Sequence, residues 1–141
     1  MSDRSYFQLR LLATDKPAEV LAYLDGEGLD FDDVPSVSNL LGNWEAEEMT
    51  VGYYDECASV LIKLDPNIVF YCWSDPAYEW LGGLVMYTPE LGRFDADCDS
   101  TGNAVFRAEQ IMGFVGGNGN SIEDLAAFTG TAWTDAFKLL R

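Results

Sequence analysis

The chain has 141 residues, in which 24 Asp and Glu face 8 Lys and Arg, with no His, so the formal net charge is −16. This balance excludes a protein that holds nucleic acid through a basic patch, and the lack of His excludes catalytic triads and zinc sites built on that residue. The 48% hydrophobic and 13% aromatic content predicts one folded acidic domain over residues 1–141 rather than a disordered acidic tail.

The N-terminal segment predicts a strand followed by a helix. Apolar and polar residues alternate over residues 6–13, which is typical of a strand with one buried face. A helix is predicted to begin within residues 14–17, since Pro is tolerated in the first turn, and to end at Gly26. The buried stripe of this helix consists of Val20, Leu21 and Leu24.

A long acidic connection is predicted over residues 26–39, which contain two Gly and one Pro. Trp44 and an acidic cluster at residues 45–48 follow, and residues 49–54 are predicted to form a short strand. Asp55 is a candidate N-cap for a second helix that runs to Leu64. This helix is predicted to stop there because Pro66 disfavours the helical conformation in the residue before it.

The next segment predicts a β meander. Residues 68–73, 80–87 and 93–98 have the composition of strands, and the turns between them contain Pro and Gly. From Ala104 onward the pattern fits either a strand or a helix. The Gly82-Gly83 pair inside the second strand predicts a bulge or a close approach of another backbone.

The C-terminal segment predicts a flexible Gly/Asn hinge at residues 116–120, followed by helices. Ser121 begins the first of these with a capping-box pattern in which Asp124 replaces Glu or Gln, and Gly130 breaks it. One face of the closing helix is formed by Trp133, Ala136, Phe137 and Leu140. The order of elements predicts an α+β fold, with helices packed on one face of a mostly antiparallel sheet.

Three cysteines, Cys57, Cys72 and Cys98, form an odd set without a CxxC pair. This pattern indicates reduced thiols in a cytoplasmic protein, and at least two of them are expected in or near the core. No apolar run approaches the roughly 20 residues that span a bilayer. The first residues do not show a basic stretch followed by an apolar one, so we expect a cytoplasmic location.

Asp95, Asp97 and Asp99 form the sharpest local cluster of carboxylates, because residues at this spacing share one face of a strand. The spacing resembles the opening of a calcium loop, but Ser100 replaces the turn Gly and Phe106 replaces the bidentate Glu. We therefore interpret the cluster as the outward polar face of a strand and expect no metal and no cofactor.

The most informative feature is a long segment in which all the charged side chains are acidic. Between Pro17 and Ile62 there are eleven carboxylates and no Lys, Arg or His. Because burying an unpaired charge is prohibitively costly, residues 26–48 are expected to form an exposed acidic surface. The predicted partner-binding acids are Asp30, Asp32, Asp33, Glu45, Glu47 and Glu48.

Four aromatic residues around the Ser74-Asp75-Pro76 turn are the second candidate feature of a partner-binding site. They are Tyr71, Trp73, Tyr78 and Trp80. Trp and Tyr are enriched at the energetic centres of interfaces, although large aromatics also dominate cores. Alternation places Tyr71 and Trp73 on the same face of one strand, so both should be buried or both exposed.

These features favour a non-enzymatic inhibitor that presents acids to a basic nucleic-acid-binding protein. A charge of −16 equals that of about 27 Å of duplex DNA. Small acidic proteins of this kind occur among phage anti-restriction and anti-CRISPR inhibitors, a likeness of charge and size without a shared motif. No direct binding to nucleic acid or membrane is expected. The alternative is a small-ligand or enzymatic domain with a pocket lined by Trp73, Trp80 and Trp133.

Overall fold

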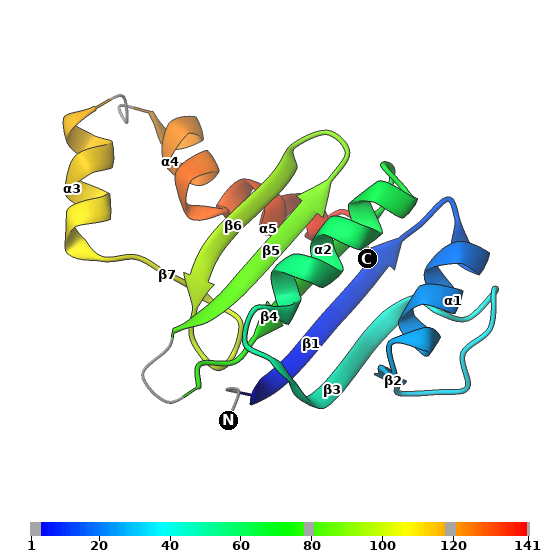
Figure 1. The fold of residues 1–141 in the computed structure, drawn as a ribbon. Helices are drawn as coiled ribbons and strands as arrows, with labels where there is room; N and C mark the ends of the chain where they lie inside the picture. Colours follow the sequence, from blue (N-terminus) through cyan, green and yellow to red (C-terminus); the bar gives the residue numbers. More distant parts are fainter. Residues whose placement is uncertain (1–3, 78–80, 118–120, 141) are drawn as a thin grey trace.

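The computed structural model describes residues 4–77, 81–117 and 121–140 (Figure 1). Its centre is a seven-stranded antiparallel sheet with the strand order β2-β3-β1-β4-β5-β6-β7. The strands are β1 (Arg4–Ala13), β2 (Asp30–Phe31), β3 (Gly42–Thr50), β4 (Val69–Ser74), β5 (Gly82–Thr88), β6 (Gly92–Cys98) and β7 (Ala104–Val105). The helices are α1 (Pro17–Gly26), α2 (Tyr53–Leu64), α3 (Ala108–Gly116), α4 (Ile122–Thr129) and α5 (Thr131–Lys138). The predicted α+β fold with a C-terminal meander is confirmed.

The larger apolar layer lies between the sheet and the helices α1 and α2. Phe7, Leu9 and Leu11 of β1 point into it from the middle of the sheet and are almost completely buried. Val20 and Leu24 of α1, together with Cys57 and Leu61 of α2, cover them. The alternation of apolar residues in β1 therefore fixes which face these helices cover.

Helix α5 lies on the opposite face of the sheet, so the prediction that the helices pack on one face is wrong (Figure 1). Its Trp133 and Phe137 are buried against residues of β4, β5 and β6. The reason is visible in β5, where Leu84, Val85 and Met86 are all buried although neighbouring side chains point to opposite faces. A strand that is apolar on both faces needs a covering layer on each side.

Strand β3 corrects a second prediction, since only Met49 and Thr50 of the strand expected over residues 49–54 are in a strand, at the end of a longer one, and residues 53–54 begin α2. Trp44 and Ala46 are buried, whereas Glu45 and Glu47 between and after them are exposed. Phe31 of β2 stacks on Trp44 with ring centroids 4.6 Å apart, and the indole N–H of Trp44 donates to the carbonyl of Leu40 at 2.9 Å. Tertiary burial of Trp44 thus overrides the low strand propensity of the acids around it.

Most remaining boundaries agree with the sequence within two residues, and α2 begins two residues before Asp55. Ser121 caps α4 as predicted, because its Oγ accepts a hydrogen bond from the Asp124 N–H at 3.0 Å. Gly130 separates α4 from α5 in a left-handed conformation with φ of 84°. Residues 118–120 of the predicted hinge lie outside the described residues. In the described part of the chain, no helix is long and apolar enough to cross a bilayer.

The three cysteines are free and buried, as expected. Cys57 and Cys72 belong to the layer under α1 and α2, and Cys98 belongs to the layer under α5. Burial raises the pKa of Cys57 to about 12 and that of Cys98 to about 12. Thiols with such pKa values are protonated at neutral pH and are poor nucleophiles.

Gly82 occupies the close backbone approach that the sequence predicted. A Cβ built on Gly82 would overlap the carbonyl oxygen of Ser74 and would lie 2.9 Å from Cys98 Sγ and 3.0 Å from the backbone N of Pro76. Two of these three atoms belong to the backbone, so the contact cannot be relieved by turning a flexible side chain.

We expect Gly82→Ala to lower the free energy of unfolding by about 1–3 kcal/mol through overpacking. The control is Gly113→Ala, because a Cβ at Gly113 meets no atom within 4 Å and Ala is favoured over Gly in a helix by up to about 1 kcal/mol. Urea denaturation of both variants measures the difference. Equal stability of the two variants would contradict the close approach.

Asp65 is the most buried carboxylate of the described residues, with 1% of its surface exposed. It accepts hydrogen bonds from the Thr14 hydroxyl at 2.6 Å, from the Asp15 N–H at 2.8 Å and from the Asn67 N–H at 2.9 Å. Burial acts to raise the pKa of this carboxyl, but the hydrogen bonds outweigh it, so the pKa lies below the ordinary value. Asp65 therefore ties the start of α1 to the turn before β4.

Asp65→Asn should destabilise the fold by about 1–3 kcal/mol at neutral pH, because an amide N–H₂ would face a backbone N–H donor. A lowered folded pKa contributes stability above the ordinary Asp pKa of about 3.9, and this stability is lost as the pH falls through the folded value. The difference between wild type and variant should therefore shrink below about pH 4. Chemical denaturation across pH tests this, and a difference that is independent of pH would refute the assignment.

Candidate functional site

The register of four neighbouring strands places acids and an aromatic residue in one row. Asp30 of β2 pairs with Glu45 of β3, Glu45 pairs with Gln8 of β1, and Gln8 pairs with Trp73 of β4. Residues directly opposite each other in an antiparallel sheet point to the same face. This face is the one opposite to Trp44, so it is not covered by α1 or α2.

The row is part of a surface that we call the acidic sheet face. Its residues are Tyr6, Gln8, Asp30, Glu45, Glu47, Trp73 and Asp75. The Tyr6 hydroxyl donates a hydrogen bond to Glu45 Oε2, and the Asp75 N–H donates to the Tyr6 carbonyl at 2.9 Å. Helix α5 lies over β4 to β6, away from β2 and β3 (Figure 1), and Asp30, Glu45 and Glu47 remain exposed.

The neighbouring acids oppose ionisation of the Tyr6 phenol. The hydrogen bond to Glu45, then burial, then the charges of Glu45, Glu47 and Asp75 raise the pKa of Tyr6 to about 12. Arg10, on the same side of β1, donates through Nε to Asn43 at 3.0 Å. Within the described residues neither Arg4 nor Arg10 forms an ion pair. The carboxylates of the face therefore form no ion pair with these two Arg residues, although Arg10 lies on the same side of the sheet.

The structure brings three of the six predicted acids, Asp30, Glu45 and Glu47, onto the acidic sheet face. Asp32 and Asp33 follow β2 directly, and Glu48 lies where an extra residue in β3 interrupts the pairing with β1. All six are exposed, and among the described residues none pairs with Lys or Arg. The role of these acids in partner binding stays a prediction.

Asp33 is held more rigidly than its exposure suggests. It accepts hydrogen bonds from the backbone N–H of Val34 at 2.8 Å and from the side chain of Asn39 at 3.1 Å. These two bonds, the first more than the second, lower the pKa of Asp33 below its ordinary value. The loop after β2 thus presents an ionised and oriented carboxylate.

Tyr71 and Trp73 share one face of β4, as predicted, and both are half-buried. Their ring centroids are 4.9 Å apart, and the turn at Gly102 packs against both rings. The Tyr71 hydroxyl donates to the Gly102 carbonyl, and burial raises the Tyr71 pKa to about 12. Tyr78 and Trp80, the other two predicted aromatics, lie outside the described residues.

The Trp73 and Asp75 side chains carry buried polar atoms at the border of the acidic sheet face. Trp73 Nε1 and Asp75 Oδ1 are inaccessible and have no hydrogen-bond partner within the part of the chain that the structure describes. Burial raises the pKa of Asp75. The nearby Trp73 indole lowers this pKa in part, although its N–H does not form a hydrogen bond with the carboxylate.

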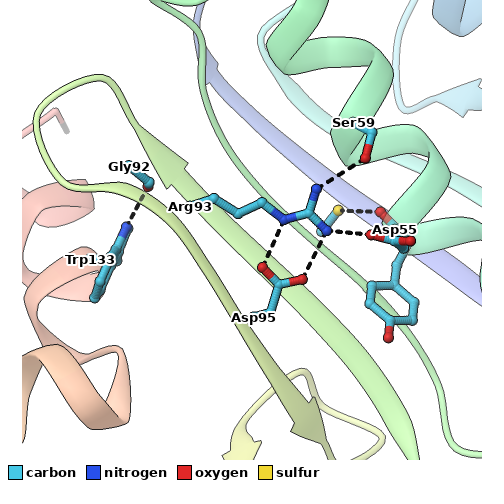
Figure 2. Close-up of polar contacts among 8 residues, drawn as sticks. Asp55, Ser59, Gly92, Arg93, Asp95 and Trp133 are labelled. Carbon is cyan, nitrogen blue, oxygen red and sulfur yellow. Dashed lines mark hydrogen bonds and ion pairs between the residues drawn. The ribbon is translucent and has the colours of Figure 1, made fainter.

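In the cluster of Asp95, Asp97 and Asp99, the first and the last have structural roles among the described residues. Figure 2 shows Arg93 between Asp95, which it contacts at 2.7 Å, and both Asp55 and Ser59 of α2. Arg93 therefore ties β6 to α2. Asp99 lies beyond β6 and accepts hydrogen bonds from Thr101 and Asn103. Among the described residues, no group of three or more His, Cys, Asp or Glu is placed to hold a metal ion.

Of the three residues proposed to line a ligand pocket, Trp80 lies outside the described residues, and Trp133 is buried in the layer under α5. Its indole N–H donates to the Gly92 carbonyl at 2.8 Å (Figure 2), and its ring packs on Phe94 with centroids 5.0 Å apart. A neighbouring groove of about 310 Å³ runs from Tyr71 and Met86 to Thr134. Tyr71 is the one titratable residue in its described lining, so this groove offers little acid or base chemistry.

Sequence reasoning missed Tyr6, Gln8 and Asp75 as members of the acidic sheet face. For Tyr6 and Gln8 a signal was present, because the alternation in β1 already assigned them to the face opposite Phe7 and Leu9. Their position beside Glu45 follows from strand pairing across about forty residues of chain. For Asp75 we find no local signal.

Comparisons with known proteins found no match to this chain among family models, curated proteins or solved structures. The functional argument therefore rests on the chemistry of the acidic sheet face.

Asp30 and Glu45 face each other across β2 and β3, and neither forms an ion pair among the described residues, so this is a repulsive pairing. We expect Asp30→Asn to stabilise the fold by about 0.5 kcal/mol at low ionic strength, with the gain disappearing as salt screens the repulsion. Glu90→Gln, at an exposed turn on the other half of the sheet, is the control and should have no effect. Thermal or urea unfolding measures both, and a destabilised Asp30→Asn would contradict the repulsive pairing.

Proposed function

We propose that the protein is a non-enzymatic inhibitor that occupies the basic nucleic-acid-binding surface of another protein. The observation that carries the proposal is the cross-strand row in which Asp30 and Glu45 stand opposite each other, exposed and without an ion pair among the described residues. A domain that needed only solubility would gain from interspersed charges of both signs. The repulsion between Asp30 and Glu45 instead lowers the stability of the fold. Such a local conflict is expected at a functional site.

The spacing of these charges suits a mimic of phosphates. Neighbouring strands lie about 4.8 Å apart, and side chains on one face of a strand repeat at about 6.7 Å. Duplex DNA carries a charge for every roughly 1.7 Å of its axis, shared between two strands. Carboxylates on a twisted sheet edge offer a partner a comparable array of anionic oxygens, which Arg side chains bind in a bidentate manner.

The sheet also supplies rigidity that an acidic tail lacks. Glu45 is oriented by Tyr6, Asp33 by Val34 and Asn39, so less conformational freedom is lost when the partner binds. Half-buried Trp73 borders the acids and offers a large apolar contact of the kind that anchors interfaces. The acids thus attract a basic partner at long range, and the oriented side chains give it a rigid surface to bind.

The proposal predicts fast association that weakens with salt. The partner is captured from cell lysate on the immobilised protein at low salt and eluted at high salt, and its association rate is then measured against salt. We expect Asp30→Lys/Asp32→Lys/Glu47→Lys to slow association by more than about tenfold near 0.15 M salt. This variant leaves the Tyr6 to Glu45 and Asn39 to Asp33 hydrogen bonds in place.

The matched control is Glu19→Lys/Asp25→Lys/Glu90→Lys, which changes the net charge equally at exposed acids elsewhere. It should slow association by less than about threefold, since steering depends mainly on charge near the interface. The captured partner should also bind its nucleic acid and this protein in a mutually exclusive manner. Equal slowing by both variants, or a ternary complex with the nucleic acid, would refute the inhibitor.

A further inference from the structure

A second candidate site is a pocket on the side of the sheet that α2 covers, next to the start of β5 and the end of β6. Its volume is about 510 Å³, which lies within the range of small-ligand sites. We call it the Asp97 pocket. Its described lining includes the side chains of Val51, Tyr54, Leu81, Asp97 and Arg107.

The register of the sheet explains why Asp97 faces this pocket. Asp97 of β6 pairs with Gly83 of β5, and residues directly opposite each other point to the same face. On that face the ring of Tyr54 lies against Gly83, where a Cβ would overlap it. Because Gly83 also pairs with Ser74, this is the face opposite to Trp73. The Asp97 pocket and the acidic sheet face are therefore on opposite sides of the sheet.

Asp97 is half-buried, and its carboxylate forms no ion pair within the part of the chain that the structure describes. Its neighbours differ in this respect, because Arg93 contacts both Asp95, at 2.7 Å, and Asp55 (Figure 2). Burial, followed by the charges of Asp55, Asp95 and Asp97, raises the pKa of the Tyr54 phenol above its ordinary value. The pocket therefore favours a positively charged group beside Asp97.

Arg107 brings a positive charge to the same pocket. Val105 of β7 pairs with Asp97, and Arg107 follows Val105 by two residues with an extended backbone. Arg107 is thus a diagonal neighbour of Asp97, at a backbone distance of about 7–8 Å. Its Nη1 lies 3.8 Å from the Glu109 carboxylate, and both side chains are exposed, so this ion pair contributes little stability. A guanidinium has five N–H donors, so Arg107 can bind a second carboxylate.

A ligand with one charge of each sign fits these two residues. At long range a chain with a net charge of −16 repels anions, whereas a zwitterion has no net charge and can reach Arg107. Hydrogen bonds between charged groups are roughly twice as strong as neutral ones, which favours a ligand that forms them with both Asp97 and Arg107. Val51 and Leu81 supply apolar surface beside these groups, so the rest of the ligand should be apolar.

We propose that the Asp97 pocket binds a free α-amino acid with an apolar side chain. The ammonium group of the ligand donates to the Asp97 carboxylate, and its carboxylate accepts hydrogen bonds from the Arg107 guanidinium. The apolar side chain packs on Val51 and Leu81. This binding does not depend on the inhibitor proposed above, because the acidic sheet face is on the other side of the sheet.

Titration of the ¹⁵N-labelled whole chain with three probes, followed by NMR at about pH 6.5, tests the proposal. L-leucine carries both charges, L-leucinamide keeps only the ammonium, and N-acetyl-L-leucine keeps only the carboxylate. The amine is protonated at this pH, since α-amino groups titrate near about 7.7–8.0. We expect leucine to bind with a dissociation constant on the order of 1 mM or below, and each of the other probes to bind at least about tenfold more weakly. Amide shifts should centre on Gly52, Gly82 and Arg107.

Two variants assign each charge of the ligand to its residue. Asp97→Asn should weaken leucine and leucinamide by about tenfold and leave N-acetyl-leucine unchanged. Arg107→Gln should weaken leucine and N-acetyl-leucine by a similar factor and leave leucinamide unchanged. The matched controls are Glu90→Gln and Lys63→Gln, which make the same changes of charge at exposed residues near the other ends of β6 and α2. They should leave all three affinities unchanged.

A chain that shows no shift change with leucine at about 10 mM overturns the proposal. Equal affinity for the three probes also overturns it, because the pocket would then not require both charges. The same holds if the site variants and the control variants weaken leucine equally, or if the shifts centre on the acidic sheet face.

Discussion

The burial of Trp44 determines which way the acids of β3 point. Its ring is stacked on Phe31 and its indole N–H is bound to the Leu40 carbonyl, under the layer formed by α1 and α2. A shift of one residue would expose Trp44 and turn Glu45 and Glu47 into the core, at the cost of desolvating unpaired charges. The same contact that stabilises the edge of the sheet therefore displays carboxylates on the other face.

Burial of apolar side chains offsets the electrostatic repulsion between the exposed acids. Strand β1 pairs with β3 on one side and with β4 on the other, so the acidic edge is attached to the most buried part of the sheet. Phe7, Leu9 and Leu11 are almost fully buried there. Apolar burial of this kind stabilises each large side chain by about 1.5–3 kcal/mol, which exceeds the few tenths of a kcal/mol of one repulsive cross-strand pair.

Much of the fold follows from local patterns. The alternation in β1, the turn residues of the meander and the cap at Ser121 each depend on neighbouring residues, and each was predicted from them. Strand β3 was missed in part because its Glu and Ala have low strand propensity, whereas Trp44 is buried by packing on Phe31 and in the core layer under α1 and α2. The consecutive buried residues of β5 are the local signal for covering layers on both faces of the sheet.

The candidate site, like the fold, could be predicted from the sequence only in part. The sequence identifies the acids and their exposure, because unpaired charge must reach water. It does not identify the row of Asp30, Glu45, Gln8 and Trp73, because that row depends on the register of strands that are far apart in the chain. Tyr6 joins the site for the same reason, since Glu45 reaches it only after β1 and β3 have paired.

Each of the two apolar layers contains at least one cysteine, whose thiol can be used to detect the opening of that layer. Cys57 and Cys72 lie beneath α1 and α2, and Cys98 lies beneath α5. Their thiols are protonated and shielded while the layers are closed, so an alkylating reagent modifies each thiol only when its own layer opens. The rates at which the single thiols are modified therefore measure separately how often the helices on each side leave the sheet.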